Sequence, residues 1–337
     1  MLLVTSERFE EHVTPPGHPE RMERARVFTT VAERRIRAGA RGLAPRPATR
    51  EELARVHDAD HLDALAAIAG RAVSLDADTY TSPESIEIAA LAAGAAVQAS
   101  EHALAHREAA FALVRPPGHH AERDRAMGFC FYNNIAVSAA AARAGGTSRV
   151  AIVDIDVHHG NGSQWMFYDD PNVLYISSHQ YPFYPGTGAA NETGTGAGKG
   201  FTVNIPLEAG ATDADYVLAY DAIALPVLEQ FKPELTLVSA GFDAHKHDPL
   251  ASMRMTAEGY GAIVSRLALM ARRHGALALI TEGGYNLPAL EACLEESLTA
   301  AESTESRPAP ASALGPAPRG ERAVAAVRAA QEGYWKL

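Results

Sequence analysis

The sequence has few of the features that define a specialised class of protein. Its 337 residues include only two cysteines, Cys130 and Cys293, which is too few for a disulfide framework or a thiolate zinc site. No apolar run is long enough for a transmembrane helix, and the N-terminus lacks the basic and apolar segments of a signal peptide. Lysine and arginine number 30 against 41 acidic residues, so the basic excess typical of nucleic-acid binding is missing. We therefore expect a cytoplasmic protein that binds neither membrane nor nucleic acid.

The sequence does contain a series of short, almost purely apolar runs. They cover residues 111–114, 149–155, 173–177, 201–205, 235–239 and 276–280. Runs without polar alternation are typical of strands in a parallel sheet that is covered on both faces. Helical patterns lie between them, over residues 84–106, 134–144, 213–230 and 257–273. This alternation predicts an α/β fold with a mostly parallel sheet and helices on both faces.

The domain organisation follows from composition. We find no internal repeat, and residues 1–302 are predicted to form a single catalytic domain. Residues 303–320 are rich in proline, alanine and serine, which predicts a linker. Residues 321–337 can form a C-terminal helix that docks back on the domain through Tyr334 and Trp335.

Polar motifs follow five of the predicted strands. In chain order they are RPPGHH, DVHHGNG, SSHQYPFYPGTG, GFDAH and EGGYN. Ligands of open α/β sheets bind outside the carboxyl ends of the strands. The five loops therefore predict one functional site at that edge of the sheet.

The segment that begins at Asp154 indicates a metal centre. Asp154, Asp156 and His158 alternate at a strand end, where residues two apart point to the same face. Aspartate and neutral histidine supply the O and N donors that zinc accepts, and a catalytic zinc needs three protein ligands with one position open. Asp243, at the end of another strand, is the natural third ligand. An isolated Asp-x-Asp would as readily be a helix cap or a turn, but the added His158, His159 and Asp243 favour the metal site.

Two further motifs offer acid–base and oxyanion chemistry. His119 and His120 lie on a loop stiffened by prolines, and two imidazoles can divide the roles of general base and general acid. Tyr285 lies on a glycine turn, where a phenol could polarise a carbonyl and stabilise an oxyanion. Each motif alone would be ascribed to a surface histidine pair or to a core tyrosine.

Aromatic residues in two loops are candidates for channel walls. Phe129 lies beside Gly128, and Phe183 and Tyr184 lie in a glycine-rich rim loop. Aromatic walls suit a long aliphatic stem such as that of lysine. Core packing is an equal alternative for Phe131.

Taken together, the five motifs resemble the zinc-dependent histone deacetylase family. The resemblance is strongest to its class II-like branch, with the bacterial histone deacetylase-like amidohydrolases and acetylpolyamine amidohydrolases. It extends from about residue 18 to residue 285. It implies the arginase/deacetylase fold, with about eight strands, and hydrolysis of acetylated or short-acylated lysine by metal-activated water.

The resemblance also assigns roles to individual residues. It implies one Zn²⁺ per chain, held by Asp156, His158 and Asp243. The implied catalytic residues are His119 as base, His120 as acid, Tyr285 for the transition state, Asp154 as partner of His119, and Asn161 opposite His120. A structural K⁺ would be bound by Asp154, by the carbonyl groups of Asp156 and His158, and by Ser177. A second monovalent ion would lie near Phe167, Asp170 and Val173.

Substrate contacts are implied for residues around the pocket: Gly128, Phe129, Tyr184, Leu250, Asp78 and Gly283. Arg24 would line an exit for acetate. Leu250 stands where polyamine-specific vertebrate relatives carry a glutamate, which favours acyl-lysine over acetylpolyamine. The partner would therefore be an acyl-lysine peptide or a small acylated amine.

Three alternatives to an acyl-lysine deacylase were open from the sequence. An acetylpolyamine amidohydrolase would use the same mechanism on another substrate. An arginase-like ureohydrolase needs two manganese ions bridged by carboxylates, and RPPGHH offers no adjacent carboxylate ligand. A catalytically silent acyl-lysine binding protein would have lost a ligand or Tyr285, and all are present. The sequence leaves acyl-chain length open, as well as Zn²⁺ against Fe²⁺, and the rim loops and C-terminal helix could each form a homo-oligomer interface.

Overall fold

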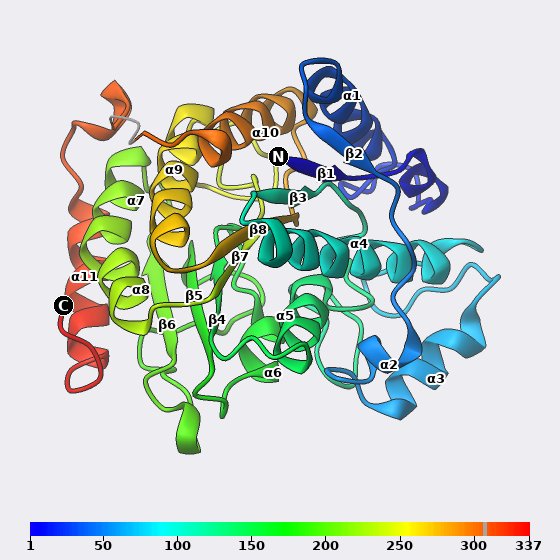
Figure 1. Ribbon diagram of the computed structural model, residues 1–337, viewed down its shortest axis with the longest axis horizontal. Helices are drawn as coiled ribbons and strands as arrows, with labels where there is room; N and C mark the ends of the chain where they lie inside the picture. Colours follow the sequence, from blue (N-terminus) through cyan, green and yellow to red (C-terminus); the bar gives the residue numbers. More distant parts are fainter. Residues whose placement is uncertain (306–308) are drawn as a thin grey trace.

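A single parallel sheet forms the centre of the molecule in the computed structural model, which describes residues 1–305 and 309–337. Its strand order is β2-β1-β3-β8-β7-β4-β5-β6 (Figure 1), and the described strands pair in parallel throughout. The strands are β1 (Leu2–Val4), β2 (Arg41–Leu43), β3 (Ala110–Ala112), β4 (Val150–Asp154), β5 (Val173–Gln180), β6 (Thr202–Leu207), β7 (Leu235–Ala240) and β8 (Ala276–Thr281). The predicted α/β fold with about eight strands is confirmed, and the six predicted runs correspond to β3–β8.

Helices cover both faces of this sheet. They are α1 (Glu23–Arg37), α2 (Arg50–Leu53), α3 (Ala59–Ile68), α4 (Ser85–His106), α5 (Asn134–Ala144), α6 (Asn161–Met166), α7 (Asp213–Ala219), α8 (Leu225–Phe231), α9 (Ala257–His274), α10 (Leu287–Glu302) and α11 (Pro318–Ala330). Successive strand residues alternate between two cores. Val150 and Ile152 pack with α4 and α5, whereas Ala151 and Val153 pack with α1 and α7–α11.

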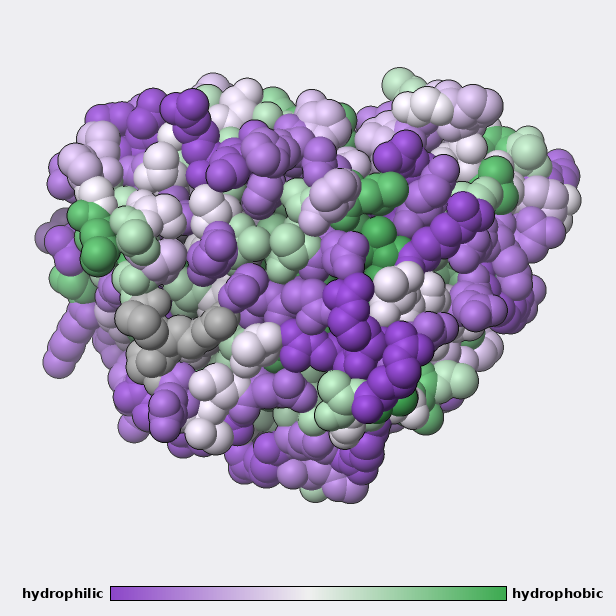
Figure 2. Space-filling model, turned by 90° about the horizontal axis from the view of Figure 1, so that it is seen from above, coloured by the Kyte–Doolittle hydropathy of each residue, from purple (hydrophilic) through white to green (hydrophobic). Residues whose placement is uncertain are grey.

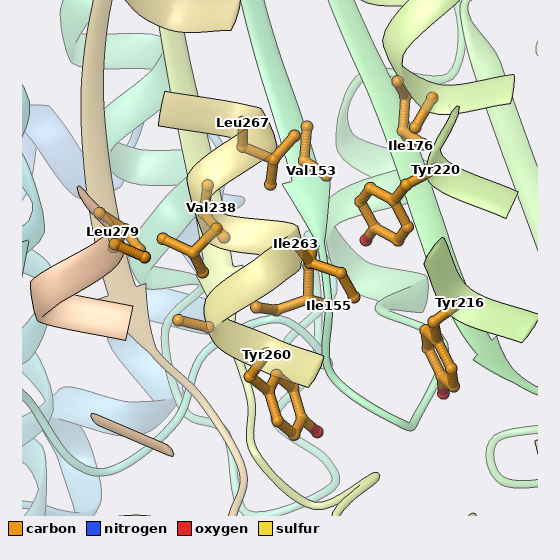
Figure 3. Packing of buried hydrophobic residues seen from close by; sticks show 14 of the residues in the cluster. Val153, Ile155, Ile176, Tyr216, Tyr220, Val238, Tyr260, Ile263, Leu267 and Leu279 are labelled. Carbon is orange, nitrogen blue, oxygen red and sulfur yellow. The ribbon is translucent and has the colours of Figure 1, made fainter. Parts of the chain in front are cut away.

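The second core illustrates how the strands and helices interlock. Figure 3 shows four strand residues facing the helices: Val153, Ile176, Val238 and Leu279. Ile263 and Leu267 of α9 and Tyr220 close over them, and all of these side chains are fully buried. Such packing, with buried side chains from β3–β8, explains why those strands appear as unbroken apolar runs in the sequence. The surface in Figure 2 is largely hydrophilic with scattered apolar patches, in agreement with a net charge of −11.

The segment 213–230 departs from the single helix that we predicted. The chain forms α7, then a π-helical turn at Tyr220–Ala224, then α8. Pro226 lies in the first turn of α8. Because proline has no N–H and its ring clashes with the preceding helical turn, a continuous α-helix is interrupted there.

The C-terminal segment packs along α7 and the outer strand β6, as Figure 1 also shows. Asp215 accepts hydrogen bonds from the backbone N–H groups of Arg319 (2.9 Å) and Gly320 (2.8 Å) at the start of α11. The indole of Trp335 donates to the carbonyl of Gly200 at 2.7 Å. α11 begins at Pro318, inside the segment 303–320 that composition had suggested as linker, because proline suits the first turn of a helix. Residues 306–308 of that segment lie outside the described residues.

Candidate active site

Two aspartate side chains and one histidine side chain converge beyond the carboxyl ends of β4 and β7. Asp156 and His158 follow β4, Asp243 follows β7, and these two strands are neighbours in the sheet. The ligand atoms of the three residues lie within 4.8 Å of one another. His158 Nδ1 is 3.2 Å from Asp156 Oδ1 and 3.1 Å from Asp243 Oδ2. The sequence spacing and the strand order thus bring together a set of donors that could hold one metal ion.

The two carboxylates are oriented from behind by backbone amides. Asp156 accepts hydrogen bonds from the N–H groups of His158 (2.8 Å) and Gly283 (2.9 Å), and Asp243 accepts one from Val157 (2.9 Å). Burial alone lowers the pKa of His158, but its bonds to Asp156 and Asp243 outweigh this and raise the pKa to about 10. Two fully buried carboxylates therefore favour a positive charge between them, which is the condition that a metal cation satisfies.

The tandem histidines lie beside this group and have different partners. His119 Nδ1 is 3.0 Å from Asp154 Oδ2, and His120 Nδ1 is 2.8 Å from Asn161 Oδ1. The two ring centroids are 4.1 Å apart. His119 Nε2 lies 3.8 Å from Asp156 Oδ1. The Nδ1 atom of each ring thus has a hydrogen-bonding partner, which leaves Nε2 available for proton transfer.

The surroundings of the two imidazoles shift their pKa values in opposite directions. Burial lowers the pKa of His119, but Asp156 and Asp154 together outweigh it and hold the pKa well above its usual value. Burial lowers the pKa of His120 well below its usual value, and the neighbouring rings of His119 and His158 lower it further. Groups with pKa values displaced in opposite directions are suited to divide acid and base roles.

Tyr285 is anchored through its backbone. Its N–H donates to Asp248 Oδ2 at 2.7 Å, and the guanidinium of Arg24 lies 5.0 Å from its ring centroid. Arg24 is fully buried, donates to the carbonyl of Gly284 at 2.8 Å, and is paired with Glu20 at 2.9 Å. The structure thus places Arg24 directly beneath Tyr285, and its role in an acetate exit stays a prediction.

A narrow pocket of about 220 Å³ leads to these groups. Among its lining residues are His119, His120, His158 and Tyr285, together with Asp78, Gly128, Phe129, Phe183, Tyr184 and Leu250. The ring of Phe183 stacks on His158 with centroids 5.4 Å apart and an interplanar angle of 17°, and the ring of Phe129 meets Tyr285 edge to face. Gly283, predicted as a substrate contact, does not line this pocket. It lies behind the carboxylates of Asp243 and Asp156, and an added side chain at this position would collide with both.

Residues 18–301 match the model of the histone deacetylase domain. This chain belongs to the histone deacetylase family.

Several members of the family are similar over most of the chain. A protein of Archaeoglobus fulgidus named "Probable deacetylase" is 41% identical over 85% of this chain and 81% of its own. The histone deacetylase-like amidohydrolase of Pseudomonas aeruginosa is 43% identical, over 81% of this chain and 75% of its own. Histone deacetylase 15 of Arabidopsis thaliana is 41% identical, over 86% of this chain and 53% of its own. The crystal structure of the HDA15 HD domain superposes with a TM-score of 0.91 at 35% identity and covers 99% of this chain and 97% of that one.

Two acidic residues in this histone deacetylase family member were not singled out from the sequence. Glu282 is fully buried, and its Oε2 accepts from the backbone N–H groups of Gly118 (2.6 Å) and His119 (3.1 Å). Asp248 Oδ1 also accepts from Leu250 N at 3.0 Å. Glu282 begins the quoted motif EGGYN and Asp248 follows shortly after GFDAH, so an acidic residue close to a strand-end motif was the available signal.

The rim loop is held by a buried polar network. Glu192 accepts from Gly188 N (3.1 Å) and from the amide of Gln164 (2.7 Å), and His159 Nε2 is 2.9 Å from Gln164 Oε1. The network fixes the loop that carries Phe183 and Tyr184. His159 is therefore engaged away from the metal group.

Two of the residues predicted to bind potassium, Asp154 and Ser177, lie next to each other in the sheet. Asp154 and Ser177 are partners in the β4–β5 register, and Ser177 Oγ is 2.9 Å from His179 Nδ1. The phenol of Tyr175 donates to Asp154 Oδ2 at 3.2 Å. The potassium site, and the second one near residues 167–173, stay predictions.

Proposed function

We propose that this chain is a zinc-dependent deacylase that hydrolyses the amide of an acetylated or short-acylated lysine side chain. The observation that carries the proposal is the convergence of His158, His119, His120 and Tyr285 on one narrow, aromatic-walled pocket. A pocket of this shape admits a long aliphatic stem and brings its terminal amide to the polar groups. Membership of the histone deacetylase family supports a hydrolase that acts on such amides.

The proposed zinc ligands are Asp156, His158 and Asp243. Their two carboxylates and one imidazole match the donors of a catalytic zinc with an open position, and the backbone amides behind the carboxylates fix the donor directions. Zinc in this place supplies a Lewis acid and lowers the pKa of a water molecule. Metal analysis of the purified protein would separate zinc from iron, which accepts the same donors.

The proton transfers would be carried out by side chains of the protein. With Nδ1 of His119 turned to Asp154, its Nε2 can accept the proton that the attacking water gives up. The charge of Asp156 is the strongest influence that raises the pKa of His119, and it is neutralised once Asp156 serves as a metal ligand. His120, with Nδ1 held by the neutral Asn161, would donate a proton from Nε2 to the departing amine. It must be protonated before that step although burial lowers its pKa, and the proton that His119 takes from the water restores the balance. The phenol of Tyr285 donates a hydrogen bond to the developing oxyanion.

The substrate contacts follow the pocket. Phe129, Phe183 and Tyr184 would enclose the alkyl stem, with Leu250 and Asp78 nearer the rim. A structural potassium bound by Asp154, Ser177 and nearby carbonyl groups belongs to the same proposal and is supported by the pairing of these two residues across β4 and β5.

Initial rates on a matched panel test the proposal. The panel holds an acetyl-lysine peptide, longer acyl-lysine peptides, and acetylated putrescine and spermidine, each with and without a chelator. We expect chelator-sensitive turnover of the lysine peptides, abolished in Asp156→Ala and reduced about 100-fold or more in Tyr285→Phe. Higher rates on acetylpolyamines would favour the alternative substrate with the same mechanism. No turnover by the metal-loaded protein would favour a silent acyl-lysine binding protein.

A further inference from the structure

The buried side chain of Asn161 joins His120 to an acidic residue that has no part in the chemistry described above. Its Oδ1 lies 2.8 Å from His120 Nδ1, and its Nδ2 donates to Glu122 Oε1 at 2.7 Å. Glu122 is half-buried and lies outside the catalytic pocket. A carboxylate therefore stands behind His120, with one amide group between them.

The orientation of the Asn161 amide follows from what its neighbours can accept. An ionised carboxylate accepts hydrogen bonds and donates none, so the amide nitrogen has to face Glu122. Two further acceptors, the carbonyl of His120 and the Sδ atom of Met127, each lie 3.4 Å from the same nitrogen. All three acceptors thus lie on the nitrogen side of the amide, which leaves Oδ1 to face the ring of His120.

This orientation determines where His120 holds its hydrogen atoms. Because an amide oxygen can only accept, the Nδ1 atom that faces it must carry a hydrogen and donate it. A general acid gives up the proton on Nε2, and an Nδ1–H group that faces an acceptor keeps its hydrogen bond before and after that transfer. With the amide reversed, an N–H group would face Nδ1 and would oppose the doubly protonated ring that the transfer requires.

The backbone of Glu122 is held in place by buried contacts. His57 is buried, and its Nε2 accepts from Asn133 N at 2.9 Å. Its Nδ1 therefore carries the hydrogen and donates it to the carbonyl of Glu122, also at 2.9 Å. On the outer side, Arg125 pairs with Glu122 Oε1 at 2.9 Å, and the side chain of Arg125 is 60% exposed. The position of the carboxylate thus depends on the inner contacts more than on the ion pair at the surface.

We propose that Glu122 is a positioning residue for proton transfer by His120, because it holds the oxygen of the Asn161 amide toward the ring. The inference rests on the proposed deacylase function and adds a residue to its acid–base groups. Each of the two catalytic histidines then has a carboxylate behind it. Asp154 contacts His119 directly, whereas Glu122 acts on His120 through a neutral amide.

Substitutions at position 122 separate the orientation of the amide from the charge of the carboxylate. Glu122→Ala leaves the amide free to reverse, so kcat on an acetyl-lysine peptide should fall about tenfold or more, with KM within about twofold of wild type. Glu122→Gln keeps an acceptor oxygen for the amide and should keep most of the rate. Arg125→Ala is the matched control, because it removes only the exposed ion pair and should leave kcat nearly unchanged.

A second substitution, at Asn161, tests whether Glu122 acts through the amide. Asn161→Asp presents an oxygen to His120 whichever way the new carboxylate turns, so it needs no partner to orient it. We therefore expect the double variant Glu122→Ala/Asn161→Asp to be about tenfold or more faster than Glu122→Ala alone. A general weakening of the loop that carries Glu122 could not be repaired in this way.

The outcomes separate the role of Glu122 from the chemistry. A wild-type kcat in folded Glu122→Ala, or a double variant no faster than Glu122→Ala, would overturn that role and leave the deacylase function standing. A loss as large in Glu122→Gln or in Arg125→Ala would also overturn it. No turnover of any acetyl-lysine substrate by the zinc-loaded wild type would instead contradict the deacylase function itself. If thermal unfolding shows that Glu122→Ala is not folded, Glu122→Met fills a similar volume without a carboxylate and must show the same loss and the same repair by Asn161→Asp.

Discussion

The position of Tyr285 depends on one carboxylate, and its removal should separate binding from turnover. Asp248 Oδ2 accepts from Tyr285 N (2.7 Å) and Asn286 N (3.3 Å), and its Oδ1 accepts from Leu250 N (3.0 Å). Asp248→Ala leaves these amides without their acceptor. With about 1.5 kcal/mol for each of the two shorter bonds, we expect the free energy of unfolding to fall by about 3 kcal/mol.

The kinetic consequence is larger than the loss of stability. A misplacement of about 1 Å in a catalytic group costs about 100-fold in rate, so kcat of Asp248→Ala should fall by about that factor. KM should change less than kcat, because the aromatic walls that hold the alkyl stem are untouched and only Leu250, at the rim, also loses its acceptor. Asp248→Asn keeps one acceptor oxygen and the side-chain volume, and should recover most of the rate.

A double-mutant cycle decides whether Asp248 acts through the phenol. Steady-state kinetics on an acetyl-lysine peptide would be measured for Asp248→Ala, Tyr285→Phe and the double variant. Because Asp248 positions Tyr285, the double variant should be no slower than Tyr285→Phe alone. Asp221→Ala, which breaks an exposed ion pair with Arg266, is the matched control and should leave kcat unchanged. A wild-type kcat in folded Asp248→Ala, or additive losses in the double variant, would refute the reasoning.

Three further predictions concern stability. Burial raises the pKa of Glu282 from 4.5 to about 7, so the stability of the wild type relative to Glu282→Gln is greatest below about pH 4.5. It should fall by up to about 3 kcal/mol as pH rises to 7, and denaturant unfolding that shows the same difference at both pH values would contradict this. Asp215→Ala removes the acceptor at the start of α11 and should cost about 1–2 kcal/mol, whereas Glu208→Ala, which breaks an exposed ion pair, should cost under about 1 kcal/mol in the same assay. Leu267→Ala should lower the free energy of unfolding by about 2–5 kcal/mol with kcat/KM unchanged, and a comparable loss of kcat/KM would show that the core and the site are coupled.

The fold was largely predictable because strands β3–β8 each contain a run of mostly apolar residues. Strands β3–β8 are buried on both faces, so each appears as an unbroken run. β1 and β2 were missed for a physical reason. Each is three residues long, and β2 lies exposed at the edge of the sheet with an arginine and a glycine, which carry no strand pattern. Local patterns also failed at Pro226, where a single residue divides a helix that its neighbours would continue.

The candidate site was predictable as a set of loops, but its supporting contacts were not. Motifs at strand ends indicated the metal group and the histidines because a parallel sheet collects such ends along one edge. The bonds of Glu282 to the histidine loop and of Asp248 to Tyr285 join side chains to backbone amides far away in the sequence. No residue pattern encodes a partner of that kind. Gly283 illustrates the converse, since the family resemblance implied a substrate contact, while the turn of the chain places it behind the carboxylates of Asp243 and Asp156.

The strand order also determines the order in which the parts of the candidate site can form while the chain is being synthesised. β8 is the last strand of the chain, yet it lies between β3 and β7 in the finished sheet. Until the ribosome has made it, the group β2-β1-β3 and the group β7-β4-β5-β6 have no strand to join them. Asp156, His158 and Asp243 all belong to the second group, whereas His119 follows β3 and Tyr285 follows β8. A nascent chain can therefore bring its three proposed metal ligands together first, and it lacks Tyr285 until its final strand has been made.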